Sequence, residues 1–341
     1  TPEAPRVQEL MRKMVENGCR CCVMEVSSHS LVQRRVDGVE FDVGIFTNLT
    51  QDHLDYHGTM EEYYRAKRRL FEIIEGQAGK RGKILVNNDD RWGHRIVDEF
   101  HRRVKVWTYG FSVVSDYRVR DAKVDINGTT FTLCAKGREY LVRVPLIGQF
   151  NVYNTVAALA GANLVGVEMR AAVEAVTRVP QIPGRLERVP AKRAFQVFVD
   201  YAHTPDALKN VLETLRELKP RRILTVFGCG GDRDRTKRSM MAEIAERYSD
   251  WVILTSDNPR SEEPDAIMRE AAHGFSKENH EMIVDRGEAI RRAVNLAGNG
   301  DVVLIAGKGH ENYQEIRGVR YPFNDVEQAS KAISEKPSVV E

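Results

Sequence analysis

The first part of the chain carries apolar residues at helical spacing and then in a strand-like run. Residues 5–17 predict an amphipathic helix that ends at Gly18, since glycine readily adopts the left-handed conformation found just after helices. An apolar run at 19–26 predicts a buried strand, and a second strand is predicted over 42–49. The polar sequence 25–29 marks the end of the first strand.

A longer helix is predicted to begin at Thr59 and to run to about Ile74. Thr59 and Glu62 have the spacing of a capping box, in which each side chain can bond the backbone N–H group of the other residue. Strands near 83–87 and 105–109 are predicted on either side of another short helix.

Residues 116–146 change in character, because apolar and polar positions alternate and β-branched residues are frequent. Asn127-Gly128 is a hairpin signal, so we predict a small antiparallel patch here. A helix follows over about 151–165. The segment 179–185 contains two prolines and a glycine, which is typical of a linker between domains.

After the linker, strands and helices alternate, which predicts a mostly parallel α/β sheet. Polar clusters follow four of the strands, at 200–203, 230–233, 257–260 and 307–311. Open α/β sheets bind ligands at the carboxyl ends of their strands, so these clusters predict a binding site. The predicted strands lie near 195–200, 222–227, 251–255, 282–284 and 302–306, and the helices near 205–218, 237–248, 264–274, 286–297 and 325–334.

Composition argues against several classes of protein. The chain carries 51 basic and 49 acidic residues with the two signs interspersed, so the long basic stretch of a nucleic-acid-binding protein is missing. No apolar stretch approaches the roughly 18–20 residues that a membrane span needs. A zinc site is the weaker interpretation of the cysteines, which lack paired C-x-x-C spacing and are predicted to be buried, reduced thiols: Cys19, Cys21, Cys22, Cys134 and Cys229.

Lys67 is the most unusual residue of the first half. Its helix places it on or beside an apolar face, where a buried ammonium is costly unless it is paired. Either the side chain reaches the edge of that face, or its amine is chemically modified or binds phosphate groups. Glu25, at the end of a strand, is a sensible magnesium partner. The loop before the helix either binds a divalent cation or is an ordinary polar turn, and it holds Asp52, His53, Asp55 and His57.

Three further segments hold candidate ligand-binding residues. Asn151 and Asn154 begin a helix, where one could be an N-cap or both could hold a nucleotide. Four cations at 233–238 stand at a helix start, which the helix dipole disfavours, so they indicate an anionic ligand, with nucleic acid as the rival. In the sequence D-N-P-R, Arg260 suits a carboxylate and Asp257 an ammonium, so this turn either binds a zwitterionic amino acid or is an exposed surface turn.

The sequence contains no G-x-x-x-x-G-K-[ST] phosphate loop. The sequence G-K-G-H at 307–310 does not qualify, because its glycine spacing is wrong and neither Ser nor Thr follows the lysine. The residues therefore suggest ATP chemistry without the usual phosphate cradle.

Taken in order, the motifs closely resemble those of the Mur ligase family, from Thr1 to about residue 333. They are M-E-V-S-S-H at 24–29, T-N-L-T-Q-D-H-L-D-Y-H-G at 47–58, Y-R-A-K at 64–67, G-Q-F-N-V-Y-N at 148–154, P-G-R at 183–185, V-D-Y-A-H-T-P-D at 199–206, F-G-C-G-G-D-R-D at 227–234, D-N-P-R at 257–260 and G-K-G-H-E at 307–311.

The resemblance implies an α/β fold with two domains. Residues 1–180 would form a P-loop-type central ATPase domain that is incomplete at its N-terminus, and residues 185–341 a complete Rossmann-like C-terminal domain. The family's UDP-binding domain and phosphate loop would precede the position that Thr1 matches. We therefore expect a shortened chain with uncovered apolar surface in its first domain.

The resemblance also implies residue roles. Lys67, as its carbamate (N6-carboxylysine), would bind magnesium with His53, and Glu25 would serve the other magnesium ion; these three form the catalytic and metal-binding set. Residues that would hold the UDP-muramyl substrate are Thr1, Ser27, Gln33 and Arg35. Residues that would contact ATP are Asn151, Asn154, Arg185, Asp200 and His203. Residues that would bind diaminopimelate are Arg233, Asp257, Asn258, Pro259, Arg260, Gly307 and Glu311.

The implied reaction is an ATP-dependent ligation in peptidoglycan precursor synthesis. The γ-phosphate would pass to the D-glutamyl carboxylate of UDP-N-acetylmuramoyl-L-alanyl-D-glutamate, and the amine of meso-2,6-diaminopimelate would attack the acyl phosphate. The D-N-P-R form is associated with meso-diaminopimelate, whose second carboxylate Arg260 would pair. We expect a cytoplasmic monomer that uses ATP and Mg²⁺. The alternatives are a lysine-adding relative, a folylpolyglutamate-synthase-like enzyme, and an inactive amino-acid-binding fragment.

Overall fold

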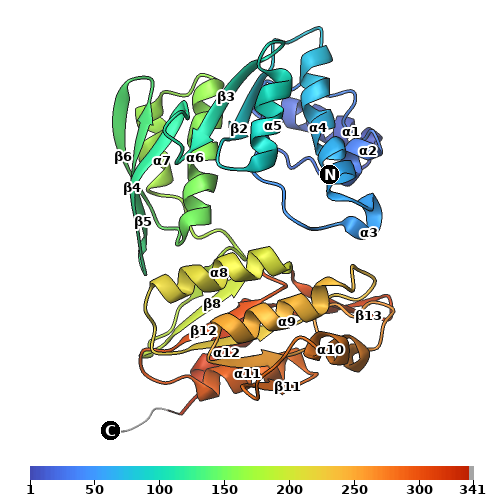
Figure 1. Cartoon of the computed structure of the whole chain (residues 1–341), viewed down its shortest axis with the longest axis vertical. Coiled ribbons are helices and arrows are strands. Elements are labelled where there is room, and N and C mark those ends of the chain that lie inside the picture. Colours follow the sequence, from blue (N-terminus) through green and yellow to red (C-terminus); the bar gives the residue numbers. More distant parts are fainter. Residues whose placement is uncertain (338–341) are drawn as a thin grey trace. The chain divides into compact units, whose positions relative to one another are not determined.

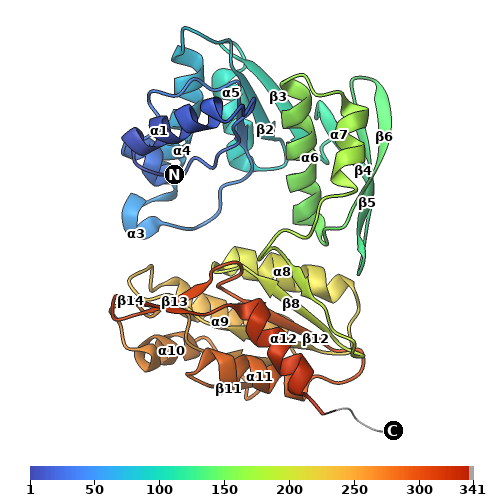
Figure 2. The same cartoon turned by 180° about the vertical axis from the view of Figure 1, so that it is seen from behind.

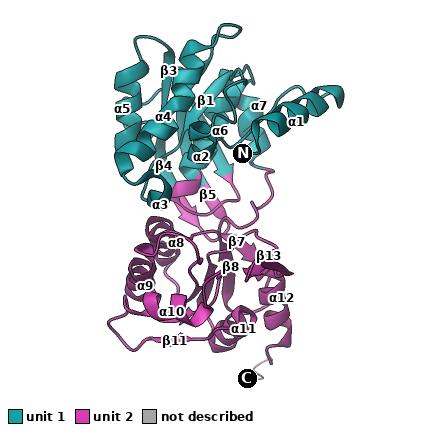
Figure 3. Cartoon of the chain, turned by 90° about the vertical axis from the view of Figure 1, so that its right-hand side faces the viewer, with its two compact units in different colours: residues 1–122, 130–143, 152–177 teal, residues 123–129, 144–151, 178–341 magenta. Residues whose placement is uncertain are grey.

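A computed structural model describes residues 1–337 (Figure 1), and the last four residues of the predicted second domain lie outside the described residues. Contacts divide the chain into two compact units, which Figure 3 shows in two colours. The segments 123–129 and 144–151 group with the second unit, although the sequence places both in the first domain. Unit 1 comprises residues 1–122, 130–143 and 152–177, and unit 2 comprises residues 123–129, 144–151 and the chain from 178 onward.

Unit 1 is built on a sheet in the strand order β1-β2-β3-β4-β5-β6. Neighbours from β1 to β4 pair in parallel. The β-rich stretch is therefore no separate patch but an extension of the main sheet, and its predicted hairpin turn lies between β4 and β5. The strands are β1 (Val43–Phe46), β2 (Lys83–Asn87), β3 (Lys105–Gly110), β4 (Tyr117–Asp125), β5 (Gly128–Ala135) and β6 (Arg138–Val144).

Helix α4 (Met60–Gly76) packs against β1 on one face of this sheet. It begins as predicted, because Thr59 Oγ1 accepts a hydrogen bond from the Glu62 backbone N–H group over 3.2 Å. Gly44 allows the close approach, since a Cβ there would lie 2.4 Å from Ile74 Cδ1. The other helices that contribute to unit 1 are α1 (Ala4–Glu16), α2 (Ser28–Val32), α3 (Leu54–His57), α5 (Arg91–Phe100), α6 (Gln149–Leu164) and α7 (Met169–Val176).

The predicted buried strand at 19–26 is wrong. These residues form no strand, and most are exposed, with Val23 at 93%. A strand needs a neighbour for its backbone groups, and within residues 1–337 the edge strand β1 pairs with β2 alone. Three cysteines predicted to be buried are consequently exposed, namely Cys19, Cys21 and Cys22. Cys229 is buried as predicted, and burial raises the pKa of its thiol to about 12.

Unit 2 contains the predicted mostly parallel sheet, in the order β11-β10-β9-β12-β8-β7. Only its edge strand β7 is antiparallel among the described strands of this sheet. A separate hairpin, β13 (Tyr313–Ile316) and β14 (Val319–Pro322), was not predicted. The sheet strands are β7 (Glu187–Val189), β8 (Gln196–Asp200), β9 (Ile223–Phe227), β10 (Trp251–Leu254), β11 (His280–Met282) and β12 (Val302–Ala306).

Helices cover both faces of this sheet, as Figures 1 and 2 show from opposite sides. On one face lie α8 (Pro205–Glu217), α9 (Lys237–Tyr248) and α10 (Pro264–Ala272); on the other lie α11 (Arg286–Leu296) and α12 (Asp325–Glu335). All residues of β9 and β12 are buried, as expected for parallel strands between two helical layers. These two strands are neighbours, and the polar loops that follow them open at the same edge.

Candidate functional site

The loops that follow β9, β10 and β12 lie against one another at the carboxyl edge of the sheet in unit 2. Gly231 N donates to the Asn258 carbonyl over 2.9 Å, which joins the first two loops. Gly307 joins the third, because a Cβ there would lie 2.6 Å from Asp257 Oδ2. Its φ of +116° is a backbone conformation that side-chain-bearing residues rarely adopt. Three of the four predicted polar clusters therefore lie together at this edge.

Asn258 and Glu311 form the centre of this edge. Asn258 Nδ2 donates to Glu311 Oε2 over 2.8 Å, and both Lys308 Nζ and the Glu315 backbone N–H group donate to Asn258 Oδ1, over 3.0 and 2.9 Å. Asp257 is 7% exposed, and its Oδ1 accepts the Asn258 backbone N–H group over 2.7 Å. Two carboxylates and an amide thus lie within one bonded network.

Arg260 lies beside this network in a left-handed backbone conformation, with φ of 52°. Its N–H group donates to Glu315 O over 3.0 Å and its carbonyl accepts from Arg317 N over 2.6 Å, so the hairpin β13–β14 holds the backbone. Nη1 donates to Gly231 O over 2.7 Å. The rest of the guanidinium has no hydrogen-bond partner among residues 1–337 and can bind a carboxylate. Pro259 precedes it, and its carbonyl accepts from Glu262 N over 3.0 Å.

The four cations at the start of α9 do not act together. Arg238 is 1% exposed and pairs with Glu262 and Glu270, at 2.7 and 2.6 Å. Arg235 also pairs with Glu270. The interpretation that this cluster marks an anionic ligand is therefore wrong for these two residues. Arg233 is exposed, and its Nη1 donates to Asp232 O over 3.0 Å.

Asp200 ends β8 and is 3% exposed. Its two oxygens accept the backbone N–H groups of Leu186 and Ala202 over 2.6 and 2.8 Å, so it fixes the linker that carries Arg185. Burial raises the pKa of Asp200 to about 6, although both hydrogen bonds oppose that shift.

Arg185 and His203 both lie beside Tyr201. The Arg185 guanidinium lies 5.3 Å from the centre of the Tyr201 ring, and the rings of His203 and Tyr201 are 4.6 Å apart. Three residues predicted to contact ATP, Arg185, Asp200 and His203, therefore come together in unit 2.

The two asparagines of α6 differ in environment. Asn151 lies inside the first turn rather than at the N-cap, is 1% exposed, and donates through Nδ2 to Ile147 O over 2.9 Å. Asn154 is exposed. The simple N-cap interpretation is wrong for both, because the helix already begins at Gln149.

In unit 1, Lys67 lies within a cluster of acidic and aromatic residues. Its ammonium is 5.2 Å from the centre of the Tyr63 ring. Burial lowers the pKa of Lys67, and the charges of Glu25 and Asp52 oppose that shift. The pKa of Tyr63 rises to about 12, chiefly through burial and also through the charges of Asp52 and Glu25. The Lys67 side chain is thus partly exposed, and the charges of Glu25 and Asp52 act on its ammonium.

Histidine rings surround this cluster. The centre of the His29 ring lies 4.9 Å from the centre of the His53 ring and 5.5 Å from that of His57. The His57 ring stacks on the Tyr63 ring, with 4.9 Å between their centres. His57 Nε2 also forms a hydrogen bond with Ser28 Oγ over 2.9 Å. Burial, with the nearby His29, His53 and Lys67, lowers the pKa of His57, so that a neutral ring is favoured.

Thr1 and Arg35 lie together at the start of unit 1. Thr1 Oγ1 donates to Glu25 O over 2.7 Å and accepts from Ser27 N over 3.2 Å, while Arg35 Nη1 donates to Thr1 O over 2.9 Å. Ser27 also caps α2 through its hydroxyl oxygen. Gln33 is the exposed C-cap residue of the same helix. The predicted substrate residues are thus neighbours, and they adjoin Glu25.

The residues predicted to bind metal are Glu25, His53 and Lys67. Among residues 1–337, no group of three or more His, Cys, Asp and Glu side chains is placed to hold a metal ion. The unmodified residues therefore do not fit a metal site. A carbamate on Lys67 would supply further oxygen ligands.

Sequence reasoning missed two buried cations of unit 2. Lys308 is 0% exposed and contacts both Asn258 and Glu311. The sequence G-K-G-H contains this lysine, but it was considered only as a possible phosphate loop. Arg286 is 1% exposed and pairs with Asp325, while its Nη1 lies 4.0 Å from Asp257 Oδ2.

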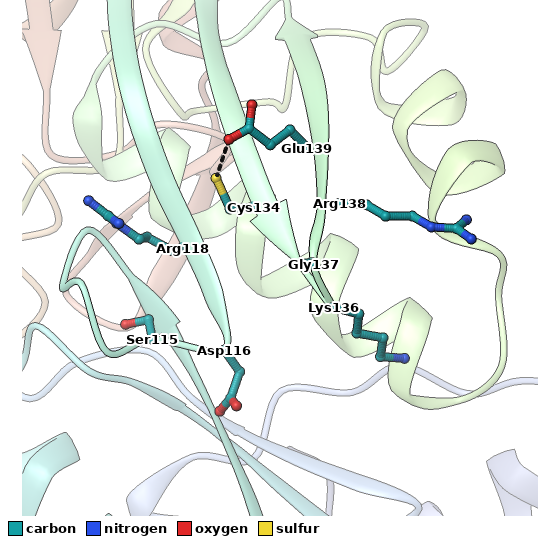
Figure 4. A pocket seen from close by; sticks show the side chains of 9 residues that line it. Ser115, Asp116, Arg118, Cys134, Lys136, Gly137, Arg138 and Glu139 are labelled. Atoms are coloured by element: carbon teal, nitrogen blue, oxygen red, sulfur yellow. Dashed lines mark hydrogen bonds between the residues drawn. The ribbon is translucent and has the colours of Figure 1, made fainter.

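A cavity of about 350 Å³ lies on unit 1, away from these residues in the sequence (Figure 4). Cys134 Sγ lies 3.7 Å from Glu139 Oε1, whereas Arg118 and Arg138 point in different directions. None of its lining residues belongs to a predicted site. A smaller cavity of about 140 Å³ in unit 2 is lined by Arg185 together with Gln181 and Arg188.

The chain is an α/β protein, with one six-stranded sheet in each unit. Residues 1–162 match the Mur ligase middle domain, and residues 184–309 match the Mur ligase glutamate ligase domain. The chain belongs to the Mur ligase family. No helix within residues 1–337 is long and apolar enough to cross a membrane.

Curated relatives extend the likeness over nearly the whole chain. The UDP-N-acetylmuramoyl-L-alanyl-D-glutamate–2,6-diaminopimelate ligases of Syntrophomonas wolfei and Bacillus cereus are 44% and 45% identical to it, and each match covers 98% of this chain and 68% of the relative. A solved structure of a ligase of that name is 38% identical, with a TM-score of 0.65 over 98% of this chain and 68% of the other. A folylpolyglutamate synthase from Mycobacterium tuberculosis shares the fold, at 20% identity and a TM-score of 0.68 over 89% of this chain and 66% of the other.

Proposed function

We propose that this chain belongs to an ATP-dependent ligase of peptidoglycan precursor synthesis that adds meso-2,6-diaminopimelate to UDP-N-acetylmuramoyl-L-alanyl-D-glutamate. The names and 44–45% identity of the curated relatives support the reaction class. The observation that carries the substrate assignment is the arrangement of Arg260 beside Asp257, Asn258 and Glu311.

The amino-acid site supplies groups for each charge of diaminopimelate. Glu311 and Asp257 can accept an ammonium group, while the open side of the Arg260 guanidinium can bind a carboxylate. L-Lysine lacks the second carboxylate and would leave the Arg260 charge without that partner, which disfavours it. Gly307 provides the space at Asp257 that a larger residue would fill. Arg233 and Pro259 belong to the same proposed site.

Lys67 is proposed to be carbamylated. A carbamate forms when the neutral amine attacks carbon dioxide and the nitrogen loses a proton to solvent, so the lowered pKa of this lysine favours the reaction. The product is an anion that converts a buried cation into an oxygen donor. With His53 it would hold one Mg²⁺ ion, and Glu25 would serve the other; the ions would neutralise charge on the phosphate groups.

The remaining residue roles are proposed from the same family pattern. Arg185, His203, Asn151 and Asn154 would bind ATP, with Asp200 fixing Arg185 through the linker. The substrate carboxylate would become an acyl phosphate, which the amine of diaminopimelate attacks with release of phosphate. The UDP-muramyl dipeptide would bind at Thr1, Ser27, Gln33 and Arg35.

The domain division is also proposed rather than measured. Residues 1–180 would serve as the central domain and residues 185–341 as the C-terminal domain, which the matched ranges 1–162 and 184–309 support. We further propose that the protein is cytoplasmic, since ATP is a substrate of the reaction. We also propose that it is a monomer.

The test is calorimetric titration of the chain with meso-diaminopimelate and with L-lysine, followed by phosphate release from a chain extended upstream to the length of its curated relatives, in the presence of ATP and the UDP-muramyl dipeptide. We expect the chain to bind diaminopimelate with higher affinity than lysine. We also expect phosphate release to require the dipeptide. Preferential lysine binding would contradict the substrate assignment. Diaminopimelate binding without any phosphate release would instead favour an amino-acid-binding fragment.

A further inference from the structure

We propose that Lys308 is a positioning residue of the amino-acid site, whose buried ammonium holds Asn258 and one oxygen of Glu311 so that the other Glu311 oxygen is presented to the ammonium of the ligand. The inference rests on the proposed function, because it concerns how the same site binds diaminopimelate.

Lys308 forms its hydrogen bonds with two residues of this site. Its side chain is 0% exposed, and Nζ donates to Asn258 Oδ1 and to Glu311 Oε2, each over 3.0 Å. Nζ also lies 5.5 Å from the centre of the Tyr313 ring. Asn258 closes the triangle, because its Nδ2 donates to Glu311 Oε2 over 2.8 Å. One buried cation therefore connects the loop after β10 with the loop after β12.

This arrangement makes the two oxygens of Glu311 unequal. Oε2 accepts hydrogen bonds from both Lys308 and Asn258, whereas Oε1 accepts none from residues 1–337. The Glu311 side chain is 19% exposed, so part of it remains accessible while Lys308 is not. A carboxylate held at one oxygen has already lost most of its rotational freedom. Ligand binding therefore does not carry the entropic cost of ordering this side chain.

A second lysine of the same unit shows what a purely structural role looks like. Lys336 Nζ donates to three backbone carbonyls, those of Val294, Asn295 and Ala297, near the end of α11. Lys308 instead donates to two side chains, and both belong to the proposed binding site. A lysine that only joined two loops would be expected to bond their backbones. Lys308 therefore orients two side chains that would contact the ligand.

The experiment compares binding of meso-diaminopimelate, by calorimetry, to the chain and to its variants K308M, K308Q, E311Q and K308M/E311Q. K308M should bind at least about tenfold more weakly, as expected when hydrogen bonds to a charged group are lost. K308Q should lie between K308M and the unsubstituted chain, because an amide can still donate. In the E311Q background, K308M should cost less than about twofold, since Lys308 acts through the Glu311 carboxylate.

Two further measurements separate this role from misfolding and from a wrong ligand. K331M, at a lysine 69% exposed on α12, should leave binding unchanged. Without any ligand, the Asn258 side-chain amide protons should exchange with solvent faster in K308M. Unchanged exchange and binding in K308M, or equal losses with and without E311Q, would overturn the role of Lys308. Lack of diaminopimelate binding by the unsubstituted chain would instead overturn the proposed function and, with it, the ligand named here.

Discussion

Arg286 and Asp325 form a bidentate ion pair in the interior of unit 2. Nε and Nη2 of Arg286 donate to the two Asp325 oxygens over 2.8 Å each, and neither side chain is exposed. Nη2 also donates to Ala306 O over 3.0 Å, at the end of β12. The pair thus links the first residues of α11 and α12 to the strand that leads into the amino-acid site.

Replacing Asp325 by Ala should lower the free energy of unfolding by about 3–5 kcal/mol, because Arg286 would remain charged and buried without its partner. Chemical denaturation of the chain measures the change. The double variant R286M/D325L should lose less than D325A, since it leaves no buried guanidinium without Asp325. A D325A curve that coincides with the unsubstituted one would contradict this account. As a control, R317A removes an exposed ion pair with Glu263 and should leave the denaturation curve unchanged.

Arg260→Ala should weaken meso-diaminopimelate binding by about 100-fold while changing L-lysine binding little. The physical reason is that only diaminopimelate has a second carboxylate for the guanidinium, and a charged hydrogen-bonded pair is strong. Calorimetric titration of both amino acids gives the ratio of affinities. R260K should recover part of the affinity, because it keeps the charge but not the fork of donors.

Arg317→Ala is the matched control for Arg260, since Arg317 lies on the adjacent hairpin and its side chain is 75% exposed. It should leave the preference for diaminopimelate unchanged. Equal loss of lysine and diaminopimelate binding in R260A would assign Arg260 to holding the loop through Gly231 O rather than to specificity.

Lys67→Ala should abolish turnover in a chain extended to the length of its curated relatives, with partial recovery when a short carboxylate is added. Carbon-13 NMR of the chain in labelled bicarbonate should show a carbamate signal that K67A lacks. The signal should grow as pH rises, because deprotonation supplies the neutral amine, and burial lowers the pKa at which this occurs. K80A, at a lysine 43% exposed and paired with Asp42, should keep the signal. A normally active K67A variant would exclude the carbamate.

Local patterns predicted most helices and strands because their signals lie within one element. The Thr59 cap and the strand–helix alternation after residue 185 are examples. The segment 19–26 failed for the opposite reason, since an apolar run becomes a strand only when a neighbour pairs with it. Likewise, no local feature of β4 indicates that it pairs with β3 in the main sheet.

The site was predictable only as far as its residue types and strand-end positions. Arg238 forms ion pairs with Glu262 and Glu270, which lie on another segment of the chain. The partner of Lys308 at Asn258 is 50 residues away in sequence. The Asp200 oxygens face backbone N–H groups, which have no signature in the sequence. Such contacts depend on the folded arrangement of loops rather than on spacing.

Asp200 should make unfolding depend on pH between about 4 and 6. Its pKa is about 6 in the folded protein against 3.8 ordinarily, because burial disfavours the charged form. Between these values the folded state holds a proton that the unfolded state has released, so stability is greatest below about pH 4 and falls as pH rises. The slope is about 1.4 kcal/mol per pH unit, and the total about 3 kcal/mol.

The measurement is chemical denaturation of the chain and of D200N at a series of pH values from about 4 to 7.5. The free energy of unfolding of the unsubstituted chain, relative to D200N, should decrease as pH rises and level off above the folded pKa, because Asn cannot titrate. D265N, which removes an exposed carboxylate at the start of α10 and keeps Asp200, serves as the matched control: its free energy of unfolding relative to D200N should fall with pH as that of the unsubstituted chain does. A constant difference between the chain and D200N across this range would mean that Asp200 is ionised throughout, and that its two backbone hydrogen bonds outweigh the effect of burial.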